Sequence, residues 1–449
     1  MSDTLICGAH VWQHGDVEMR IVGNRIAEIG SGLTRNADTQ VINATGQLLY
    51  PGLVNTHHHI AQSLFKAMPG GINSALGEWL AAVPYTVWPL LTPDSLYLAA
   101  RIGFAELLRA GCTLCADHHY LYHADTSPAL EEAVFQAAEE LGIRLMLCRG
   151  GNTVAGTHKG FRSTNLTPET LEQSIKRLQD TLAARHDTAP DAMTRVAVAP
   201  TALMHSHSPD HLKALAAFAR ENKLKRHTHL LEVSHDNDVA MAAHGMTAME
   251  YAESVEWLGD DVWYAHLVHC SPADIQRLAD TGTGIAHCPT SNCRLGSGVA
   301  PVPAMAAAGV PVSLGVDGSA SAESGSLVSE MNLAWLVHRA VQGPDATDAD
   351  TVVHWATRGG AELLGFTETG SLQVGMLADL VLYDLGQPRF EGVWDKPLAP
   401  VYCGEPLTAT AVMVNGRWRV QDGEVLGLDD TALQRDAAAE LARLKAQVA

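Results

Sequence analysis

The chain is short of positive charge. Its 449 residues carry 30 lysines and arginines against 50 aspartates and glutamates, a formal net charge of −20 at pH 7. A DNA or RNA polymer binds to a basic surface, so this composition argues against a nucleic acid partner. An acidic protein also gives no electrostatic steering to anionic substrates. Charge alone therefore favours a neutral or cationic small molecule as the partner.

Long hydrophobic runs are also missing. No apolar stretch approaches the roughly 18 residues that mark a membrane-spanning helix, although 47% of the residues are hydrophobic. The first residues, Met-Ser-Asp-Thr-Leu, lack the basic and apolar regions of a signal peptide. We therefore expect a cytoplasmic protein with no membrane partner. The chain is long enough for one large domain and a smaller one.

Several common site motifs are absent as well. The sequence contains no HExxH of zinc peptidases, no GxSxG nucleophile turn and no HxE with PCxxC of the small nucleobase deaminases. Cys112-Thr-Leu-Cys115 is a CxxC pair, but no second pair stands at zinc-ribbon spacing. The eight cysteines lie mostly inside apolar stretches. We therefore expect buried free thiols rather than a redox pair.

The two ends of the chain are rich in short strand-like segments. Residues 1–50 and 370–425 show alternating or apolar runs that are separated by turn residues such as Gly23-Asn24 and Asn415-Gly416. Neither end could bury a sheet face well alone. We therefore expect a small β-sandwich domain built from residues 1–50 and 366–430. The last residues, 431–449, read as a peripheral helix.

The middle of the chain, residues 51–365, alternates strand-like and helix-like segments. Several of the strand candidates are continuous apolar runs, as expected for a parallel sheet covered on both faces. No glycine-rich phosphate turn follows the first strand, so we predict an α/β fold of the (β/α)₈ TIM-barrel type rather than an open sheet. The eight strand candidates are 48–56, 113–117, 144–149, 195–199, 225–230, 262–267, 284–288 and 311–316.

Histidines and an aspartate end four of these strands. His57 and His59 are two apart on a strand and so share one face. His229 ends the fifth candidate. His227 shares its face, and we prefer His229 over His227 as the metal ligand. Asp317 follows the apolar run of the eighth, where a carboxylate is costly to bury unless it is paired or metal-bound. The predicted metal ligands are therefore His57, His59, His229 and Asp317.

Two more residues are candidates for acid and base chemistry. Glu232 stands three residues after His229, where the chain leaves the strand, and is a candidate proton shuttle rather than a ligand. His266 ends the sixth strand candidate, while His287 ends the seventh and ranks below it. The predicted catalytic groups are therefore Glu232, His266 and Asp317.

The substrate contacts are predicted from residues close after strands. Gln62 and Arg149 can donate hydrogen bonds to carbonyl oxygens of a substrate. Aromatic side chains could stack on a planar ring system, although such residues more often belong to the core of the barrel loops. The aromatic candidates are Trp79 and Tyr120, with Tyr85, Trp88 and Tyr122 as further ones.

At these residues the chain resembles the amidohydrolase superfamily, in its cytosine/guanine-type deaminase branch. The resemblance rests on segments along nearly the whole chain, and within the branch it is strongest to isoxanthopterin deaminases and next to 8-oxoguanine deaminases. It implies one divalent metal ion, usually zinc, on the four ligands named above, with Glu232, His266 and Asp317 as the proton-handling groups. The segments are Pro51-Gly-Leu-Val-Asn-Thr-His-His-His59, His229-Leu-Leu-Glu232, Ala265-His266, His287-Cys-Pro-Thr-Ser-Asn292, Gly315-Val-Asp-Gly318 and Gly370–Leu382.

The activity that this resemblance implies is hydrolytic release of ammonia from a small heterocyclic amine, isoxanthopterin or pterin first and 8-oxoguanine or guanine second. Two other readings stay open. A metal-dependent cyclic amide hydrolase usually needs a bridging lysine on the fourth strand, where 195–200 has none. A metal-binding module without activity would need a broken set of proton-handling residues, yet all three are present. A homo-oligomer is expected only on general grounds.

Overall fold

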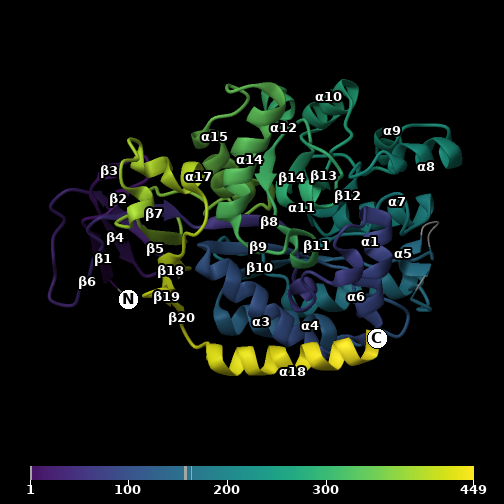
Figure 1. Ribbon diagram of the computed structural model, residues 1–449, viewed down its shortest axis with the longest axis horizontal. Helices are drawn as coiled ribbons and strands as arrows, with labels where there is room; N and C mark the ends of the chain where they lie inside the picture. Colours follow the sequence, from purple (N-terminus) through teal and green to yellow (C-terminus); the bar gives the residue numbers. More distant parts are fainter. Residues whose placement is uncertain (1–2, 156–158, 163, 449) are drawn as a thin grey trace.

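A closed barrel of parallel strands forms the centre of the computed structural model, which describes residues 3–155, 159–162 and 164–448 (Figure 1). The sheet runs in the order β15-β14-β13-β12-β11-β10-β9-β8-β16. β15 and β16 are consecutive parts of one strand, and β16 pairs with β8. The described chain therefore forms an eight-stranded barrel, and the predicted TIM-barrel fold is confirmed. The strands are β8 (Leu53–His59), β9 (Cys112–His119), β10 (Arg144–Arg149), β11 (Thr194–Val198), β12 (Arg226–Leu230), β13 (Val262–His266), β14 (Gly284–His287), β15 (Val312–Leu314) and β16 (Asp317–Gly318).

Two of the predicted strands differ from the structure. The candidate 48–56 divides at Gly52 into β7 (Gln47–Pro51), which pairs with β17 of the small domain, and β8 of the barrel. Gly52 donates to the carbonyl of Asp379 and lies so close to Thr113 that an added Cβ would stand 2.2 Å from its Oγ1. The candidate 311–316 is shorter than predicted, because the strand breaks between Leu314 and Asp317.

Helices cover the outside of the barrel, and residues that favour helix ends mark their boundaries. Thr92 caps α3 by accepting from the backbone of Ser95, with Pro93 in the first turn. α4 ends at Gly142, whose φ of 69° is a conformation that glycine adopts without strain. The longer outer helices are α3 (Pro93–Arg109), α4 (Ala129–Leu141), α6 (Leu171–Arg185), α7 (Pro209–Glu221), α8 (His235–His244), α9 (Ala248–Ser254), α10 (Pro272–Thr281), α12 (Val302–Ala307), α14 (Leu327–Gln342) and α15 (Ala349–His354).

Shorter helical segments lie between these elements, several of them at the loops that follow the strands. They are η1 (Ile60–Leu64), η2 (Pro69–Gly71), α1 (Leu76–Ala82), α2 (Pro84–Val87), η3 (Trp88–Leu90), α5 (Lys159–Arg162), α11 (Pro289–Arg294), α13 (Ser319–Ala322), η4 (Trp355–Gly359), α16 (Gly360–Leu363), η5 (Pro388–Phe390), η6 (Lys396–Leu398) and α17 (Ala399–Cys403).

The small β domain combines strands from both ends of the chain, as predicted, and in Figure 1 its purple and yellow segments lie together. One sheet has the order β5-β4-β1-β6 and the other β20-β19-β18-β17-β7-β2-β3. The first comes from the N-terminal segment, while β7 joins the second to C-terminal strands. The strands are β1 (Asp3–Cys7), β2 (His10–Val11), β3 (Gly15–Asp16), β4 (Glu18–Val22), β5 (Arg25–Gly30), β6 (Gln40–Asn43), β17 (Leu380–Asp384), β18 (Ala409–Val414), β19 (Arg417–Gln421) and β20 (Glu424–Val425).

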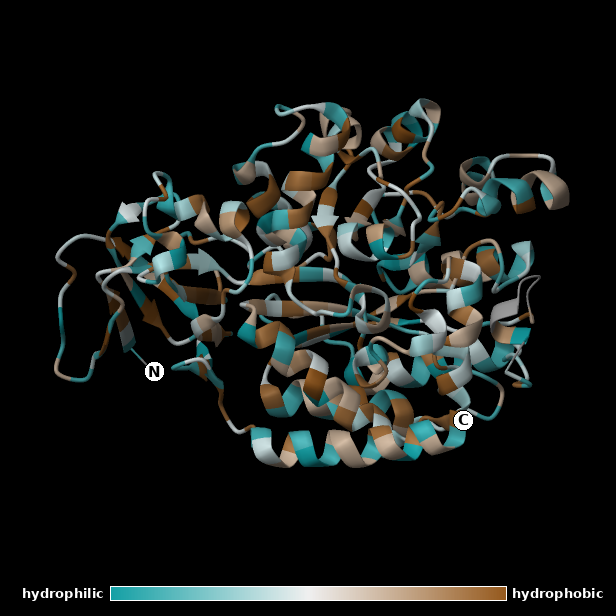
Figure 2. Cartoon of the chain, viewed as in Figure 1, coloured by the Kyte–Doolittle hydropathy of each residue, from teal (hydrophilic) through white to brown (hydrophobic). Residues whose placement is uncertain are grey.

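The last helix, α18 (Asp430–Val448), lies along the outside of the barrel against α3 (Figure 1). Ser95 of α3 donates to Glu440, and Arg443 donates to the carbonyl of Leu90. Figure 2 shows hydrophobic residues concentrated in the central strands, while α18 mixes both kinds of residue. Among the described residues, no helix has the length and apolar character to cross a membrane.

Candidate active site

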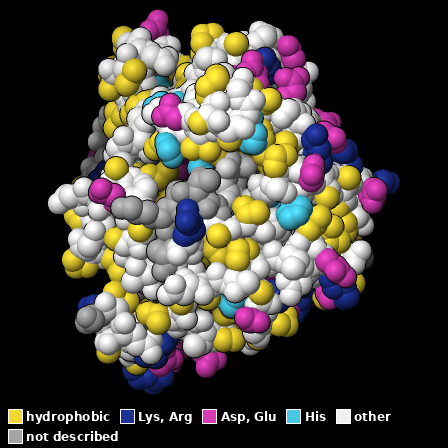
Figure 3. All heavy atoms as spheres, turned by 90° about the vertical axis from the view of Figure 1, so that its right-hand side faces the viewer, with side chains coloured by type: hydrophobic (Ala, Val, Ile, Leu, Met, Phe, Trp, Pro, Cys, Tyr) yellow, Lys and Arg dark blue, Asp and Glu magenta, His cyan; other side chains and the backbone are white. Residues whose placement is uncertain are grey.

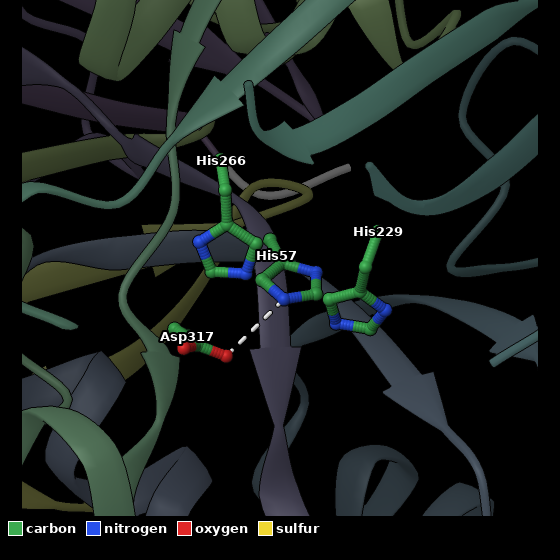
Figure 4. A group of neighbouring side chains, drawn as sticks. All are labelled: His57, His229, His266 and Asp317. Carbon is green, nitrogen blue, oxygen red and sulfur yellow. Dashed lines mark ion pairs between the residues drawn. The ribbon is translucent and has the colours of Figure 1, made fainter. Parts of the chain in front are cut away.

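The predicted ligands come together at the carboxyl ends of the barrel strands, where TIM barrels carry their chemistry. The Nε2 atoms of His57 and His59 lie 3.2 and 3.4 Å from Oδ1 of Asp317. The Nε2 atoms of His59 and His229 are 3.2 Å apart. Figure 4 shows the rings of His57 and His229 turned toward the Asp317 carboxylate. Three strands, β8, β12 and β16, therefore direct donor atoms at a common point, and β8 contributes two of them.

Hydrogen bonds on the outer side of each ring fix which nitrogen faces that point. His59 Nδ1 donates to the carbonyl of His118 at 2.8 Å, and His229 Nδ1 donates to the carbonyl of Thr201 at 2.6 Å. Because a carbonyl only accepts, each Nδ1 carries the proton. The Nε2 lone pairs of His59 and His229 therefore face each other, an arrangement that is repulsive unless a cation lies between them.

The Nε2 of His57 also carries no proton, but here the outer partner of Nδ1 is another histidine. His227 Nδ1 donates to the carbonyl of Trp263 at 2.9 Å, so its Nε2 is an acceptor. His57 Nδ1 lies 2.8 Å from that Nε2 and must donate to it. His57 Nε2, which is buried and makes no hydrogen bond, is left as a lone pair toward Asp317. His227, which we ranked below His229 as a ligand, thus orients a neighbouring ring.

The spacing and charge of this set fit a divalent metal ion. Bonds of about 2.0–2.1 Å in a tetrahedral site place the ligand atoms about 3.3 Å apart, close to the separations of 3.2–3.4 Å found here. Burial lowers the pKa of His57, lowers that of His59 to about 4 and holds that of His229 well below its ordinary value. Neutral imidazoles and an ionised carboxylate are the forms that bind metal.

Asp317 is held as a carboxylate by its surroundings. Burial alone would raise its pKa, but the neighbouring histidines, His57 first and then His266 and His59, keep the pKa well below the usual range. Its Oδ2 accepts from the hydroxyls of Ser291 and Ser321, which leaves Oδ1 for the histidine cluster. The two serines lie in the short helices α11 and α13 and were not singled out in the sequence, because a single serine gives no signal of this kind.

Glu232 and His266 lie beside the cluster and contact each other. His266 Nε2 is 3.6 Å from Oε2 of Glu232, and His266 Nδ1 donates to Asn292 at 2.9 Å. Burial raises the pKa of Glu232 to about 7. Burial would lower the pKa of His266, but the charges of Glu232 and Asp317 outweigh it and raise the pKa. The structure therefore places a carboxyl group that can exchange protons near neutrality next to the candidate metal centre.

The candidate ligand groups are larger than the predicted set. The ligand atoms of His57, His229, His266 and Asp317 all lie within 4.8 Å of one another, as do those of His59, His118 and His229. His118, buried on β9, was not predicted, since it lies in a run of polar residues with no spacing signal. His287 does not belong to either group; its Nε2 lies 3.1 Å from that of His338.

A pocket opens from the cluster and contains most of the predicted substrate residues. Gln62, Trp79 and Tyr120 line it, and so does Tyr85. Gln62 accepts from the backbone of Ala320 at 3.3 Å, which turns its NH₂ group away from that contact. Figure 3 views the face of the molecule at this end of the barrel, where histidine and hydrophobic side chains lie close together. The lining also includes Leu76, Leu80, Pro84, Thr201, Met204, His205, Val233, His235, Asp236 and Leu295.

Arg149 does not line the pocket, contrary to our expectation. Its guanidinium is buried against Glu169, with distances of 2.6 and 2.8 Å, and also donates to Ser174. The ring of Tyr122 lies 3.8 Å from the guanidinium carbon. Glu169 is far along the chain, so this pairing had no signature in the sequence. We therefore replace the proposed substrate contact of Arg149 with a role in holding the loops that follow β10.

Two other expectations concern residues near the pocket. Trp88 packs against Tyr85 and Tyr120 as a second layer and, like Tyr122, is not among the lining residues. Cys112 and Cys115 are buried free thiols, and burial raises the pKa of Cys112 to about 12. A thiol with a raised pKa is a poor nucleophile, which agrees with the predicted structural role.

Comparisons with known proteins give the family of this fold and site. The model of the amidohydrolase family matches residues 48–419. The chain is 41% identical over 435 residues to an isoxanthopterin deaminase from an unknown prokaryotic organism, covering 94% of this chain and 90% of that one. It is 39% identical over 393 residues to an 8-oxoguanine deaminase of Pseudomonas aeruginosa, covering 87% and 86%.

Solved structures agree with the sequence relatives. The structure of an atrazine chlorohydrolase from Arthrobacter aurescens TC1, complexed with zinc, has a TM-score of 0.91 at 28% identity and covers 98% of this chain and 100% of that one. The resemblance noted in the sequence is thereby confirmed, as is the expectation of an enzyme. The chain belongs to the amidohydrolase family and is a metal-dependent hydrolase with deaminases among its relatives.

Proposed function

We propose that this protein is a zinc-dependent deaminase that hydrolyses an amino-substituted bicyclic heterocycle, isoxanthopterin or pterin first, and releases ammonia. The observation that carries the proposal is the convergence of three imidazole nitrogens and one carboxylate at separations of 3.2–3.4 Å, at the base of a pocket with aromatic walls. A zinc ion held by His57, His59, His229 and Asp317 would supply Lewis-acid activation of a water molecule.

The chain's own groups then handle the protons. Asp317 and His266 hold the attacking water and take up its proton, since both lie at the cluster and one of them is an ionised carboxylate. Glu232 is protonated over part of the neutral range and gives its proton to the ring nitrogen next to the attacked carbon. The amine then accepts a proton and leaves as ammonia. Close positioning of these groups contributes as much as their acidity.

The pocket supports a flat, uncharged substrate. Trp79, Tyr85 and Tyr120 offer aromatic surface, and the NH₂ group of Gln62 can donate to a ring carbonyl. The net charge of −20 agrees with a neutral ligand. The similarity to an isoxanthopterin deaminase, at 41% identity, supports a pterin.

A second candidate is deamination of 8-oxoguanine or guanine, favoured by the 39% identity to an 8-oxoguanine deaminase. A cyclic amide hydrolase is a more distant alternative. It usually requires a lysine on the fourth barrel strand, and β11 (Thr194–Val198) contains none. The substrate assay separates the three, since a cyclic amide hydrolase releases no ammonia.

The decisive experiment is to measure ammonia release from isoxanthopterin, pterin, 8-oxoguanine, guanine, cytosine and adenosine, with the zinc content determined on the same preparation. Glu232→Gln keeps the shape of the side chain but cannot give up a proton. We expect it to lower turnover by about 10²–10⁴-fold, the usual contribution of general acid–base catalysis, with the zinc content unchanged. A Glu232→Gln rate near that of the wild type would overturn the assigned proton role.

A further inference from the structure

An ion pair at the edge of the pocket contacts both the pocket wall and the candidate metal site. Arg294 ends α11 and Glu323 directly follows α13. The Nη2 and Nε atoms of Arg294 lie 3.1 and 3.2 Å from Oε1 of Glu323. The two side chains are 15% and 34% exposed, so the pair is partly shielded from solvent. Neither residue is among those that line the pocket or has a part in the proposed chemistry.

On one side the pair is linked to the carboxylate of Asp317. Ser291 stands three residues before Arg294 on α11, and Ser321 stands two residues before Glu323 on α13. The hydroxyls of both serines donate to Oδ2 of Asp317. The helices α11 and α13 have only 6 and 4 residues, which is too short for a helix to be stable on its own. The ion pair between the two helices therefore helps to hold both serines, and with them the Asp317 carboxylate, in place.

On the other side both members of the pair hold the chain that follows β8. Arg294 Nη1 donates to the carbonyl of Gly71 at 3.0 Å, and Glu323 Oε2 accepts from the N–H of Ala67 at 2.7 Å. Gly71 packs tightly, since an added Cβ would stand 2.9 Å from Cδ1 of Trp79. Trp79 lines the pocket. A displacement of Gly71 would therefore be passed on to the side of the pocket that Trp79 forms.

We call residues 67–85 the pocket wall, because this segment contributes six of the lining residues, namely Leu76, Gly77, Trp79, Leu80, Pro84 and Tyr85. One ion pair contacts this wall directly and Asp317 through two serines. We infer that Arg294 and Glu323 are positioning residues that couple the pocket wall to the metal site. Because such coupling is reciprocal, a substrate packed on the wall stabilises the orientation of Asp317, and metal binding at Asp317 stabilises the wall.

This inference rests on the metal site of the proposed function but not on the choice of substrate. Arg294→Met keeps an apolar stem of similar length and removes both the ion pair and the hydrogen bond to Gly71. Arg294→Lys retains a positive charge and a donor that can reach one of the two partners. Arg277→Met is the matched control, because Arg277 forms ion pairs with Glu250 and Glu253 and is not a lining residue of the pocket.

Hydrogen exchange followed by mass spectrometry measures the coupling without any substrate. In the wild type we expect zinc to slow the exchange of residues 67–85 by about tenfold, within the usual range for coupled sites. In Arg294→Met the exchange of this segment should be fast with and without zinc. Arg294→Lys should recover part of the protection, and Arg277→Met should behave as the wild type. An effect of zinc on residues 67–85 that is equal in the wild type and Arg294→Met would overturn the inference.

Zinc affinity and kinetics give the reciprocal measurement. Competition with a chelator should show zinc binding about 10–100-fold weaker in Arg294→Met, the usual effect of disturbing the outer partners of a metal ligand. At saturating zinc, a loss of wall contacts alone would raise KM for the best substrate of the wild type and leave kcat unchanged. The coupling predicts that kcat falls by about tenfold as well, because catalysis depends on close positioning of the reacting groups.

The outcomes separate this inference from the proposed function. If the wild type binds no stoichiometric zinc, or releases no ammonia from any bicyclic amine, the proposed function fails. If the wild type is active and Arg294→Met keeps the wild-type kcat and zinc affinity, the coupling is wrong while the function stands. Should Arg294→Met fail to fold, Glu323→Gln is judged by the same measurements, since it retains an acceptor for Ala67 and removes the charge of the pair.

Discussion

The burial of the Glu232 carboxyl group predicts how the activity depends on pH. Burial raises its pKa to about 7, so the protonated form needed to donate to the substrate is present below that pH and is lost above it. We predict that kcat/KM for ammonia release falls about tenfold for each pH unit above about 7. A profile of kcat/KM from pH 6 to 9, with circular dichroism to exclude unfolding, measures this directly. A flat profile over that range would contradict the assignment of Glu232 as the acid.

His227 offers a test of the metal site that does not depend on activity. His227→Leu removes the acceptor for His57 Nδ1 and so loosens the orientation of His57. We predict a loss of zinc affinity of about 10–100-fold, the usual effect of removing such an outer partner. Competition with a chelator of known affinity gives the dissociation constant. His227→Gln offers an acceptor oxygen at the same position and should lie closer to wild type.

Equal zinc affinities for wild type and His227→Leu would show that the contact between His227 and His57 does not set the orientation of the ligand.

His227 and His57 also show which residues a sequence can reveal at this scale and which it cannot. His57, His59, His229 and Asp317 could be singled out as candidate ligands, because each ends an apolar run. The outer partners His227, Ser291 and Thr201 could not, because their roles depend on which segments of the chain become neighbours in the fold. The pairing of Arg149 with Glu169 was missed for the same reason.

At the scale of strands and turns, the candidate functional residues lie where the backbone is under strain. His266 and Asp317 have φ values of 78° and 58°, and Leu231, just before Glu232, has 54°. Residues other than glycine adopt such values rarely and at a cost of about 1–3 kcal/mol. His266 ends β13, Leu231 immediately follows β12, and Asp317 begins β16, the last part of the eighth strand. The turn at each of these positions therefore aims a candidate catalytic side chain, and the packed barrel below holds the turn in place.

Gly315, at the break between β15 and β16, tests this coupling. A Cβ at this position would lie 2.7 Å from the Cβ of His57, so Gly315→Ala must push β8 and the eighth strand apart. We predict lower zinc content and a destabilisation of about 1–3 kcal/mol, as for other overpacked cores. Gly70→Ala is the matched control, because its nearest neighbour would be 4.0 Å away. Zinc content and the denaturant midpoint measure both effects, and equal values for the two variants would refute the coupling.

The order of strands and helices was predictable from hydrophobic periodicity, whereas the exact ends of two strands were not. The apolar run 48–56 reads as one strand, and only the contact of Gly52 with Thr113 and Asp379 shows where it passes from one sheet to another. The run 311–316 likewise gives no sign of its break. Both errors lie where the chain contacts an element that is distant in sequence. Hydrophobic periodicity carries no information about such contacts.

At the scale of the whole molecule, we propose that residues 1–50 and 366–430 form the small domain, 51–365 the barrel and 431–449 a peripheral helix. A buried ion pair joins the first two. Arg144, at the start of β10, donates to Asp379 at 3.0 and 3.1 Å, and neither side chain is exposed by more than 1%. Asp379 also accepts from the backbone of Asn415 in the small domain. The pair therefore connects the start of β10 in the barrel to β17 and β18 of the small domain, which Asp379 and Asn415 adjoin.

Removing one member of this pair should separate stability from catalysis. Asp379→Leu leaves the Arg144 charge buried without its partner, which costs about 3–5 kcal/mol for pairs of this kind. Replacing both, as in Arg144→Met with Asp379→Leu, removes the unpaired charge and should recover much of the loss. Thermal melting of the three proteins tests the order. Arg144 begins β10 and Arg149 ends it, and the candidate metal site lies at the carboxyl end of the strand, far from Arg144. The zinc content at 25 °C should therefore stay unchanged. A double variant no more stable than Asp379→Leu would show that hydrogen bonds to the backbone, rather than the charge pair, hold the two domains together.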